Sequence, residues 1–161
     1  MDAKIINEYE RGGQLLAQAI AGLSPQDLLA PPPPDGSAGA WTIQQIVLHL
    51  MDSDLIWTER MKSIIAEDHP QIVADDESKF AANLRYDEQD PQRAVKILDL
   101  NRRSFAIVLR KLPDSAFART ATHSERGEIT LAESVDIMVR HIPHHIDFIR
   151  RKRQKLGKPL K

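Results

Sequence analysis

The sequence predicts an all-α protein, a four-helix bundle with long connections. Three observations support this fold class: four long segments repeat apolar residues at a helical spacing, caps mark where they begin, and proline-rich or polar stretches separate them. We find no alternating strand pattern and expect no sheet. With 161 residues and no internal repeat, we interpret residues 1–161 as a single domain.

The N-terminal half begins with a predicted helix over residues 2–23. Its apolar side chains recur every three or four positions, although Gly12-Gly13 interrupts them. Two glycines weaken a helix by roughly 1 kcal/mol each, so either close packing or a pocket wall compensates for them, or the helix tolerates a weak spot. Ser24-Pro25 then predicts a short helical turn, and the proline-rich residues 30–40 predict a loop.

The second long helix has the most clearly marked start. Thr42 is a predicted N-cap, and Gln45 follows three residues later, which is the spacing of a capping box. An apolar stripe continues from Ile43 to about residue 66. With successive residues about 100° apart around the helix, His49 falls at the edge of this stripe.

The remaining chain predicts two further long helices. His69-Pro70 ends the second helix, because a residue before proline avoids helical dihedrals. Residues 71–89 predict a loop with one short helix, and residues 91–112 predict the third long helix. Residues 113–129 have no sustained period and predict a loop. The last helix starts at a second capping box and covers residues 130–155.

Pro143 lies inside this last helix. A proline there lacks the backbone N–H and crowds the carbonyl group of Val139, four residues earlier. We therefore expect a kink between His141 and His145.

The composition excludes several classes of protein. The formal net charge is -1 with no long block of one sign, so nucleic acid is not an expected partner. No apolar run is long enough to cross a bilayer, and we see no signal-peptide core. The absence of cysteine removes disulfides and thiolate ligands. A cytoplasmic protein fits best, although cysteine absence alone does not exclude export.

The histidines predict a metal site. His141 and His145 are one helical turn apart, roughly 6 Å along the axis, and both lie near the apolar stripe, whereas His144 points away. Such an i,i+4 pair is used by helical zinc motifs. His49 supplies a third imidazole from another helix. We predict one divalent ion, since neutral nitrogen ligands suit zinc, nickel or iron better than calcium or magnesium. The alternative is ordinary histidines at the edge of a core.

Three protein ligands would leave a coordination position open, which is the catalytic arrangement. His123 is a candidate acid/base group or a further ligand, and its alternative is a solvated loop histidine. Asp52 could orient a ligand from the second shell, or be an exposed aspartate. Arg60 lies about 20° around the helix from His49 and roughly 16 Å along it. It could hold a bound thiol cofactor at a pocket mouth, or pair with a carboxylate on a neighbouring helix.

Several stretches are specific in combination, although each alone is weak: Trp41-Thr42, His49-Leu50-Met51-Asp52-Ser53, Arg60-Met61-Lys62, Glu67-Asp68-His69-Pro70, and His141 with His144-His145. With these stretches the chain resembles the DinB-like metalloprotein superfamily over nearly its whole length, and within it the YfiT-like branch of proposed metal-dependent hydrolases. The resemblance implies a four-helix bundle, nickel or zinc on His49, His141 and His145, and a homodimer. The chain departs from the family pattern at Phe148 and Pro143.

The resemblance and the open position lead to a hypothesis of enzyme activity. That activity would be transfer of a small thiol of the bacillithiol type to an electrophile, or a related hydrolysis, with the metal activating the thiol or a water. The alternative is a non-catalytic bundle in which the metal pins two helices and an outer surface binds a partner. A third reading, a regulator induced by DNA damage, comes only from the name of the superfamily, and the near-zero net charge argues against DNA binding.

Overall fold

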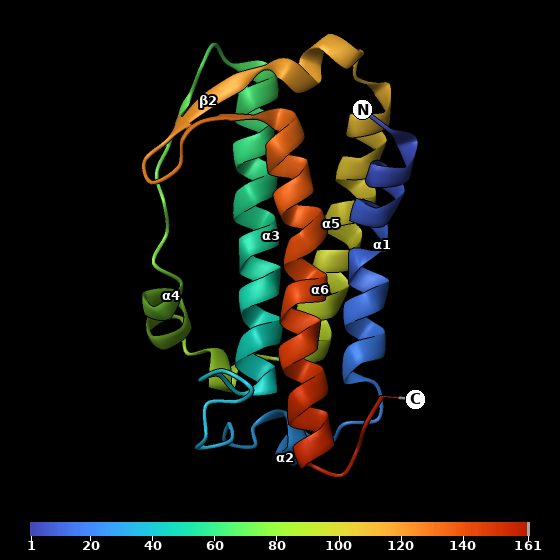
Figure 1. Cartoon of the computed structure of the whole chain (residues 1–161), viewed down its shortest axis with the longest axis vertical. Helices are drawn as coiled ribbons and strands as arrows, with labels where there is room; N and C mark the ends of the chain where they lie inside the picture. The colour runs from blue at the N-terminus through green and yellow to red at the C-terminus, as the bar shows by residue number, and fades with distance from the viewer. Residues whose placement is uncertain (161) are drawn as a thin grey trace.

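The four long helices predicted from the sequence form a bundle. In the computed structural model, which describes residues 1–160, α1 (Ala3–Ile20), α3 (Ile43–Ala66), α5 (Pro91–Lys111) and α6 (Leu131–Lys155) run side by side (Figure 1). Both α1 and α3 pack against α5 and α6. The predicted fold class is confirmed, and α1 is shorter at both ends than predicted. No helix in the described part of the chain is long and apolar enough to cross a membrane.

The directions of the helices explain the longest connection. Figure 1 shows α1 and α6 running one way along the bundle and α3 and α5 running the other way. Because α3 and α5 are parallel, the chain between them must return along the length of the bundle. Residues 67–90 make this return as a crossover, which contains α4 (Glu77–Asn83) and the 3₁₀-helix η1 (Tyr86–Glu88). Since α4 and η1 both contact α3, the crossover brings its side chains to that helix.

Predicted caps start the two helices that carry the histidines. At the start of α3, the Gln45 N–H donates to Thr42 Oγ1, and the Thr42 N–H donates to Gln45 Oε1. Thr130 and Glu133 make the same reciprocal pair at the start of α6. Each pair satisfies N–H groups that the first helical turn leaves free, and one such cap contributes about 1 kcal/mol. The short helix α2 (Pro25–Leu28) also begins with a capping box.

The expectation that the chain contains no strands is wrong. A three-stranded sheet joins β1 (Gln71–Ile72), β2 (Thr120–His123) and β3 (Gly127–Thr130), with β1 parallel and β3 antiparallel to β2. These strands are too short to show a period in the sequence. The 3₁₀-helix η2 (Asp114–Ala118) precedes them. The sheet ties the crossover to the connection between α5 and α6, and it places His123 beside the bundle.

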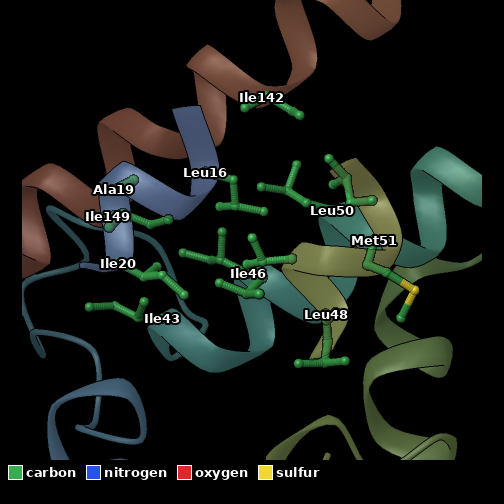
Figure 2. Packing of buried hydrophobic residues seen from close by; sticks show 14 of the residues in the cluster. Leu16, Ala19, Ile20, Ile43, Ile46, Leu48, Leu50, Met51, Ile142 and Ile149 are labelled. Carbon is green, nitrogen blue, oxygen red and sulfur yellow. The ribbon is translucent and has the colours of Figure 1, made fainter. Parts of the chain in front are cut away.

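The apolar core has two parts along the bundle. Figure 2 shows the first, in which Leu16 of α1, Leu50 of α3 and Ile142 of α6 belong to one buried cluster. The second contains Phe105 of α5 and Met138 of α6, together with β-strand residues. Burial of these side chains is the main favourable contribution to folding.

Where the two clusters meet, one buried arginine connects all four long helices. Arg102 of α5 donates from Nε to Asp54 Oδ1 of α3 at 2.6 Å. Its Nη1 donates to the Tyr9 carbonyl of α1 at 3.0 Å, and its Nη2 donates to the Met138 carbonyl of α6 at 2.9 Å. Arg102 and Asp54 are almost fully buried. Because an unpaired buried charge is strongly unfavourable, these bonds favour one relative placement of α3 and α6.

The two glycines of α1 are explained by close packing. A Cβ atom on Gly12 would lie 2.3 Å from Arg102 Nη1 and 2.7 Å from Ile142 Cδ1. On Gly13 it would lie 2.5 Å from the Cα atom of Asp99 in α5. The glycines therefore let α1 approach α5 and α6 closely, and the alternative of a tolerated weak spot is wrong.

Pro143 does not interrupt α6, which continues from Leu131 to Lys155. The proline is exposed, and it lines a surface hollow of about 260 Å³ together with Val139 and residues of α1. On this side of the helix the crowded Val139 carbonyl can tilt toward solvent. The helix therefore carries His141 and His145 as one continuous element.

Candidate metal centre

The structure brings three of the predicted site residues together. His49 of α3 faces His141 and His145 of α6, and one ring nitrogen from each lies within 4.8 Å of the others. The Nε2 atoms of His49 and His141 are 3.2 Å apart. The centroids of the three rings are 4.7 to 5.1 Å apart. These distances place the imidazoles around a common point between the two helices.

Burial keeps these imidazoles neutral. Desolvation lowers the pKa of His49 to about 4. The pKa of His141 falls to about 2, first because of burial and then because His145, His49 and Arg102 add positive charge nearby. The pKa of His145 falls to about 3 for the same leading reason. At neutral pH all three rings therefore offer lone pairs without having to release a proton.

Two ring nitrogens of this group lack partners. Among the described residues, His141 Nδ1 and His145 Nδ1 are buried with no hydrogen-bond partner. The Oγ atom of Ser53 lies 3.5 Å from His49 Nδ1 and can orient that ring, leaving its Nε2 to face the cluster. Neutral imidazoles packed together with unsatisfied nitrogens are unfavourable without a ligand. The residues present fit a divalent ion that prefers nitrogen, such as zinc or nickel.

A carboxylate that the sequence analysis missed lies beside the cluster. Glu77 Oε2 is 3.6 Å from His49 Nε2, on the first turn of α4 in the crossover. Burial raises the pKa of Glu77, and the charges of Asp75 and Asp76 raise it further. The side chain is more than half exposed. An acid just after the cap Asp76 is a signal for a helix start, but no sequence pattern places it against α3.

Two hollows meet at the histidines, and Glu77 and His141 line both. We call the first the apolar chamber, which has a volume of about 550 Å³ and is lined by Ala38, Gly39, Ala40, Trp41, Ile46, Glu77, Ser78, His141, His144, His145 and Phe148. We call the second the charged chamber, of about 380 Å³, which is lined by His49, Ser53, Trp57, Arg60, Ala74, Asp75, Asp76, Glu77, His123, Glu125, Arg126, Ile137, Met138 and His141. The site is thus accessible from two sides of different chemistry.

Arg60 lines the charged chamber but is already paired. Its Nη2 donates to Asp75 Oδ1 at 2.8 Å and to the Val73 carbonyl at 2.5 Å. The guanidinium lies over the Trp57 ring, 5.1 Å from its centroid. Arg60 is only 7% exposed. The expected pairing of Arg60 with a carboxylate is present, but the carboxylate belongs to the crossover rather than to a neighbouring helix. Because Asp75 already neutralises Arg60, this guanidinium is not free to bind a substrate carboxylate.

His123 also lines the charged chamber, and the alternative of a solvated loop histidine is wrong. It is 4% exposed and stacks on Trp57, with ring centroids 5.8 Å apart. Burial lowers its pKa, and the charges of Arg60 and Arg126 lower it further. Its Nδ1 accepts from the Glu125 N–H at 3.2 Å. A neutral ring with Nδ1 as acceptor carries its proton on Nε2. His123 is therefore suited to donate a hydrogen bond rather than to act as a base.

Asp52 does not contact the histidines as expected. Its Oδ2 accepts from the Tyr86 hydroxyl at 2.6 Å, which ties α3 to η1. The Asp52 carboxylate is engaged by the crossover instead, and the side chain that lies near His49 Nδ1 is Ser53, four residues after His49. The orienting role predicted for Asp52 therefore falls to Ser53.

The other histidines lie outside the cluster. His144 lines the apolar chamber, with its ring nearly perpendicular to those of His145 and Phe148. His69 has a positive φ of 47° just after α3, and its two ring nitrogens lie 2.9 and 2.8 Å from the hydroxyls of Thr120 and Thr122. His69 thus links the end of α3 to β2.

Comparison with known proteins yields one family and several relatives. The family described as the DinB superfamily matches residues 8–149. A protein of Oceanobacillus iheyensis, named as a candidate metal-dependent hydrolase, is 30% identical over 147 residues, covering 89% of this chain and 81% of the relative. YfiT of Bacillus subtilis carries the same kind of name and is 31% identical over 120 residues, covering 74% of this chain and 67% of YfiT.

Two solved structures share the fold. The structure of Bacillus subtilis YfiT, described as a probable metal-dependent hydrolase with an unusual four-helix bundle topology, superposes with a TM-score of 0.87 at 28% identity and covers 98% of this chain and 90% of that one. A mycothiol-dependent maleylpyruvate isomerase superposes with a TM-score of 0.70 at 9% identity, covering 91% of this chain and 59% of that one. The second likeness concerns the fold alone.

Proposed function

Because this chain belongs to the DinB superfamily, we propose that it is a metal-dependent hydrolase in which His49, His141 and His145 hold one divalent ion. The observation that carries the proposal is the convergence of three neutral imidazoles with the carboxylate of Glu77 beside them. Relatives named as candidate metal-dependent hydrolases support it. Zinc and nickel are among the metals that imidazole ligands suit.

The chain's own residues have distinct roles in this proposal. His49, His141 and His145 would hold the divalent ion, and its positive charge would lower the pKa of an attacking water. Glu77 Oε2 takes the proton that the water loses and returns it to the leaving group, so that the carboxylate is regenerated. The Nε2–H group of His123 can donate a hydrogen bond to the substrate in the charged chamber. Ser53 keeps the His49 ring oriented.

Transfer of a small thiol to an electrophile is the second candidate. The two chambers that meet at the histidines favour it, because a transferase must bind two molecules at once. The pairing of Arg60 with Asp75 argues against a thiol that carries carboxylates, such as one of the bacillithiol type, because the guanidinium is already neutralised. We therefore place hydrolysis first.

In the non-catalytic alternative, the metal only holds α3 against α6 and takes no part in a reaction.

One experiment distinguishes hydrolysis, thiol transfer and this non-catalytic role. The metal-loaded and metal-stripped proteins are compared for hydrolysis of p-nitrophenyl acetate, and for conjugation of a thiol panel to 1-chloro-2,4-dinitrobenzene. Metal-dependent hydrolysis supports the first proposal, and metal-dependent conjugation without hydrolysis supports the second. If the protein binds stoichiometric metal and neither reaction exceeds the metal-stripped background, the non-catalytic alternative replaces both.

A further inference from the structure

The apolar chamber differs in kind from the charged chamber beside it. Of the described residues that line it, only Glu77 carries a formal charge, and six of the lining residues are nonpolar or glycine: Ala38, Gly39, Ala40, Trp41, Ile46 and Phe148. The charged chamber is lined by six charged side chains, those of Arg60, Asp75, Asp76, Glu77, Glu125 and Arg126. Transfer of a charged group into the apolar chamber would therefore lose hydration with little compensation, whereas an apolar group would gain.

Aromatic rings continue from the histidines into this chamber. The Phe148 ring lies 5.2 Å from that of His144 and 6.1 Å from that of His145, measured between centroids. On the side of α3, the Trp41 ring lies 4.8 Å from that of His49. These are the separations at which aromatic rings attract one another in edge-to-face or offset arrangements. A planar ring placed here would find the same kind of partners.

Phe148 is held in place as a wall of the chamber. A Cβ atom on Gly39 would lie 3.3 Å from Phe148 Cδ1, so the backbone of the proline-rich loop passes close to the ring. The guanidinium of Arg151 lies 5.6 Å from the Phe148 centroid. A ring that is already fixed loses little further rotational freedom when a ligand packs on it. The chamber, at about 550 Å³, is within the usual range of small-molecule sites.

From this geometry we propose that the apolar chamber binds an aryl group of the substrate while the polar head of the same molecule reaches the three histidines. Phe148 is then the specificity-determining residue, and Trp41 and His144 form the remaining aromatic surface. This inference rests on the proposed function, since it requires an accessible position at the metal.

The test uses binding rather than turnover. The full-length protein is loaded with cobalt, and the affinities of acetohydroxamate and benzohydroxamate are measured by visible absorption and by calorimetry. Both compounds have the same metal-binding head, and only the second has a phenyl ring. We expect benzohydroxamate to bind the cobalt-loaded protein about tenfold more tightly than acetohydroxamate does. Both compounds should bind the metal-stripped protein more weakly than the cobalt-loaded protein.

Variants locate the phenyl ring. Phe148→Ala should remove most of the benzohydroxamate advantage and leave acetohydroxamate binding within about twofold, and Phe148→Leu should retain part of the advantage. Val139→Ala is the matched control. Val139 is also a partly buried apolar residue of α6, but it lines neither chamber. It should leave the advantage intact.

Each outcome decides a different claim. If acetohydroxamate binds and the phenyl ring adds nothing, or if both Phe148 variants keep the full advantage, the aryl site is refuted and the hydrolase proposal stands. If the cobalt-loaded protein binds neither compound, the accessible metal position is refuted, and the aryl site with it.

Discussion

Glu77 Oε2 lies 3.6 Å from Nε2 of His49, although the two residues belong to different helices. The contact exists because α3 and α5 are parallel, so that the returning crossover carries α4 past the histidines. A carboxylate in this place can accept a proton next to a nucleophile without being one of the three imidazole ligands.

The first prediction concerns this carboxylate. Glu77→Gln keeps the size of the side chain but removes its basicity, so we expect metal-dependent hydrolysis to fall about 100-fold with the metal content unchanged. Rates and metal content are measured on the same preparation. Glu125→Gln serves as the control, since Glu125 lines the charged chamber and contacts His123 through its backbone N–H. A Glu77→Gln enzyme with unchanged rate would exclude Glu77 as the proton acceptor.

A second prediction follows from the lowered histidine pKa values. In the metal-free protein, His49, His141 and His145 have pKa values of about 4, 2 and 3, whereas an unfolded histidine has a pKa of about 6.5. Below about pH 6.5 the unfolded chain therefore binds more protons than the folded chain, and the free energy of unfolding falls as the pH falls. Each histidine contributes a slope of about 1.4 kcal/mol per pH unit.

Urea unfolding of the metal-free protein at pH 7.5, 6.5 and 5.5 measures this slope. In a His141→Gln variant the slope between the two lower pH values should decrease by about 1 kcal/mol per pH unit, because one of the buried histidines with a lowered pKa is gone. An identical slope in the variant and the parent would show that His141 does not carry the expected shift.

Close packing at α1 gives a third prediction. Gly13→Ala should lower the free energy of unfolding by about 1–3 kcal/mol, although alanine favours a helix, because the added methyl group meets the α5 backbone at Asp99. Chemical unfolding is compared with that of Gln18→Ala, an exposed substitution on the same helix that we expect to be nearly neutral. A more stable Gly13→Ala protein would contradict the close approach of α1 to α5.

Self-association is the subject of the fourth prediction. The outer face of α5 exposes apolar side chains within an arc of about 100°: Ile97, Leu100, Ile107 and Val108. We expect a homodimer that covers this face. Light scattering at micromolar concentration should give a dimer for the parent and for Leu84→Asp, whose exposed leucine lies next to α4, and a monomer for Leu100→Asp. A monomeric parent would overturn the prediction.

Local patterns were sufficient to predict the helices and the three histidines. The capping pair Thr42 and Gln45 defines the start of α3, and the helical stripe places His49 on the edge that faces α6. The spacing of His141 and His145 determines that both rings project from one side of α6. These features depend only on helix geometry, which the sequence expresses directly.

The remaining site residues depend on contacts between distant segments. The crossover brings Glu77 next to His49, and a sheet of very short strands places His123 in the wall of the charged chamber; neither segment has a periodic signal in the sequence. Arg102 has a periodic signal in the sequence, because it lies on the apolar stripe of α5 between Leu98 and Phe105. A charged side chain at such a position must be buried and paired. Its partner Asp54 could not be identified from the sequence, because that choice depends on how α3 and α5 align.

The metal content of the purified protein tests the central claim most directly. Elemental analysis should find one zinc or nickel ion per chain in the parent, in His144→Ala and in His69→Ala, because those two histidines lie outside the cluster. Replacement of His49, His141 or His145 by alanine should abolish stoichiometric metal, since two imidazoles hold an ion far more weakly than three. Full metal occupancy in the His145→Ala protein would contradict the assignment of the three histidines as the ligands.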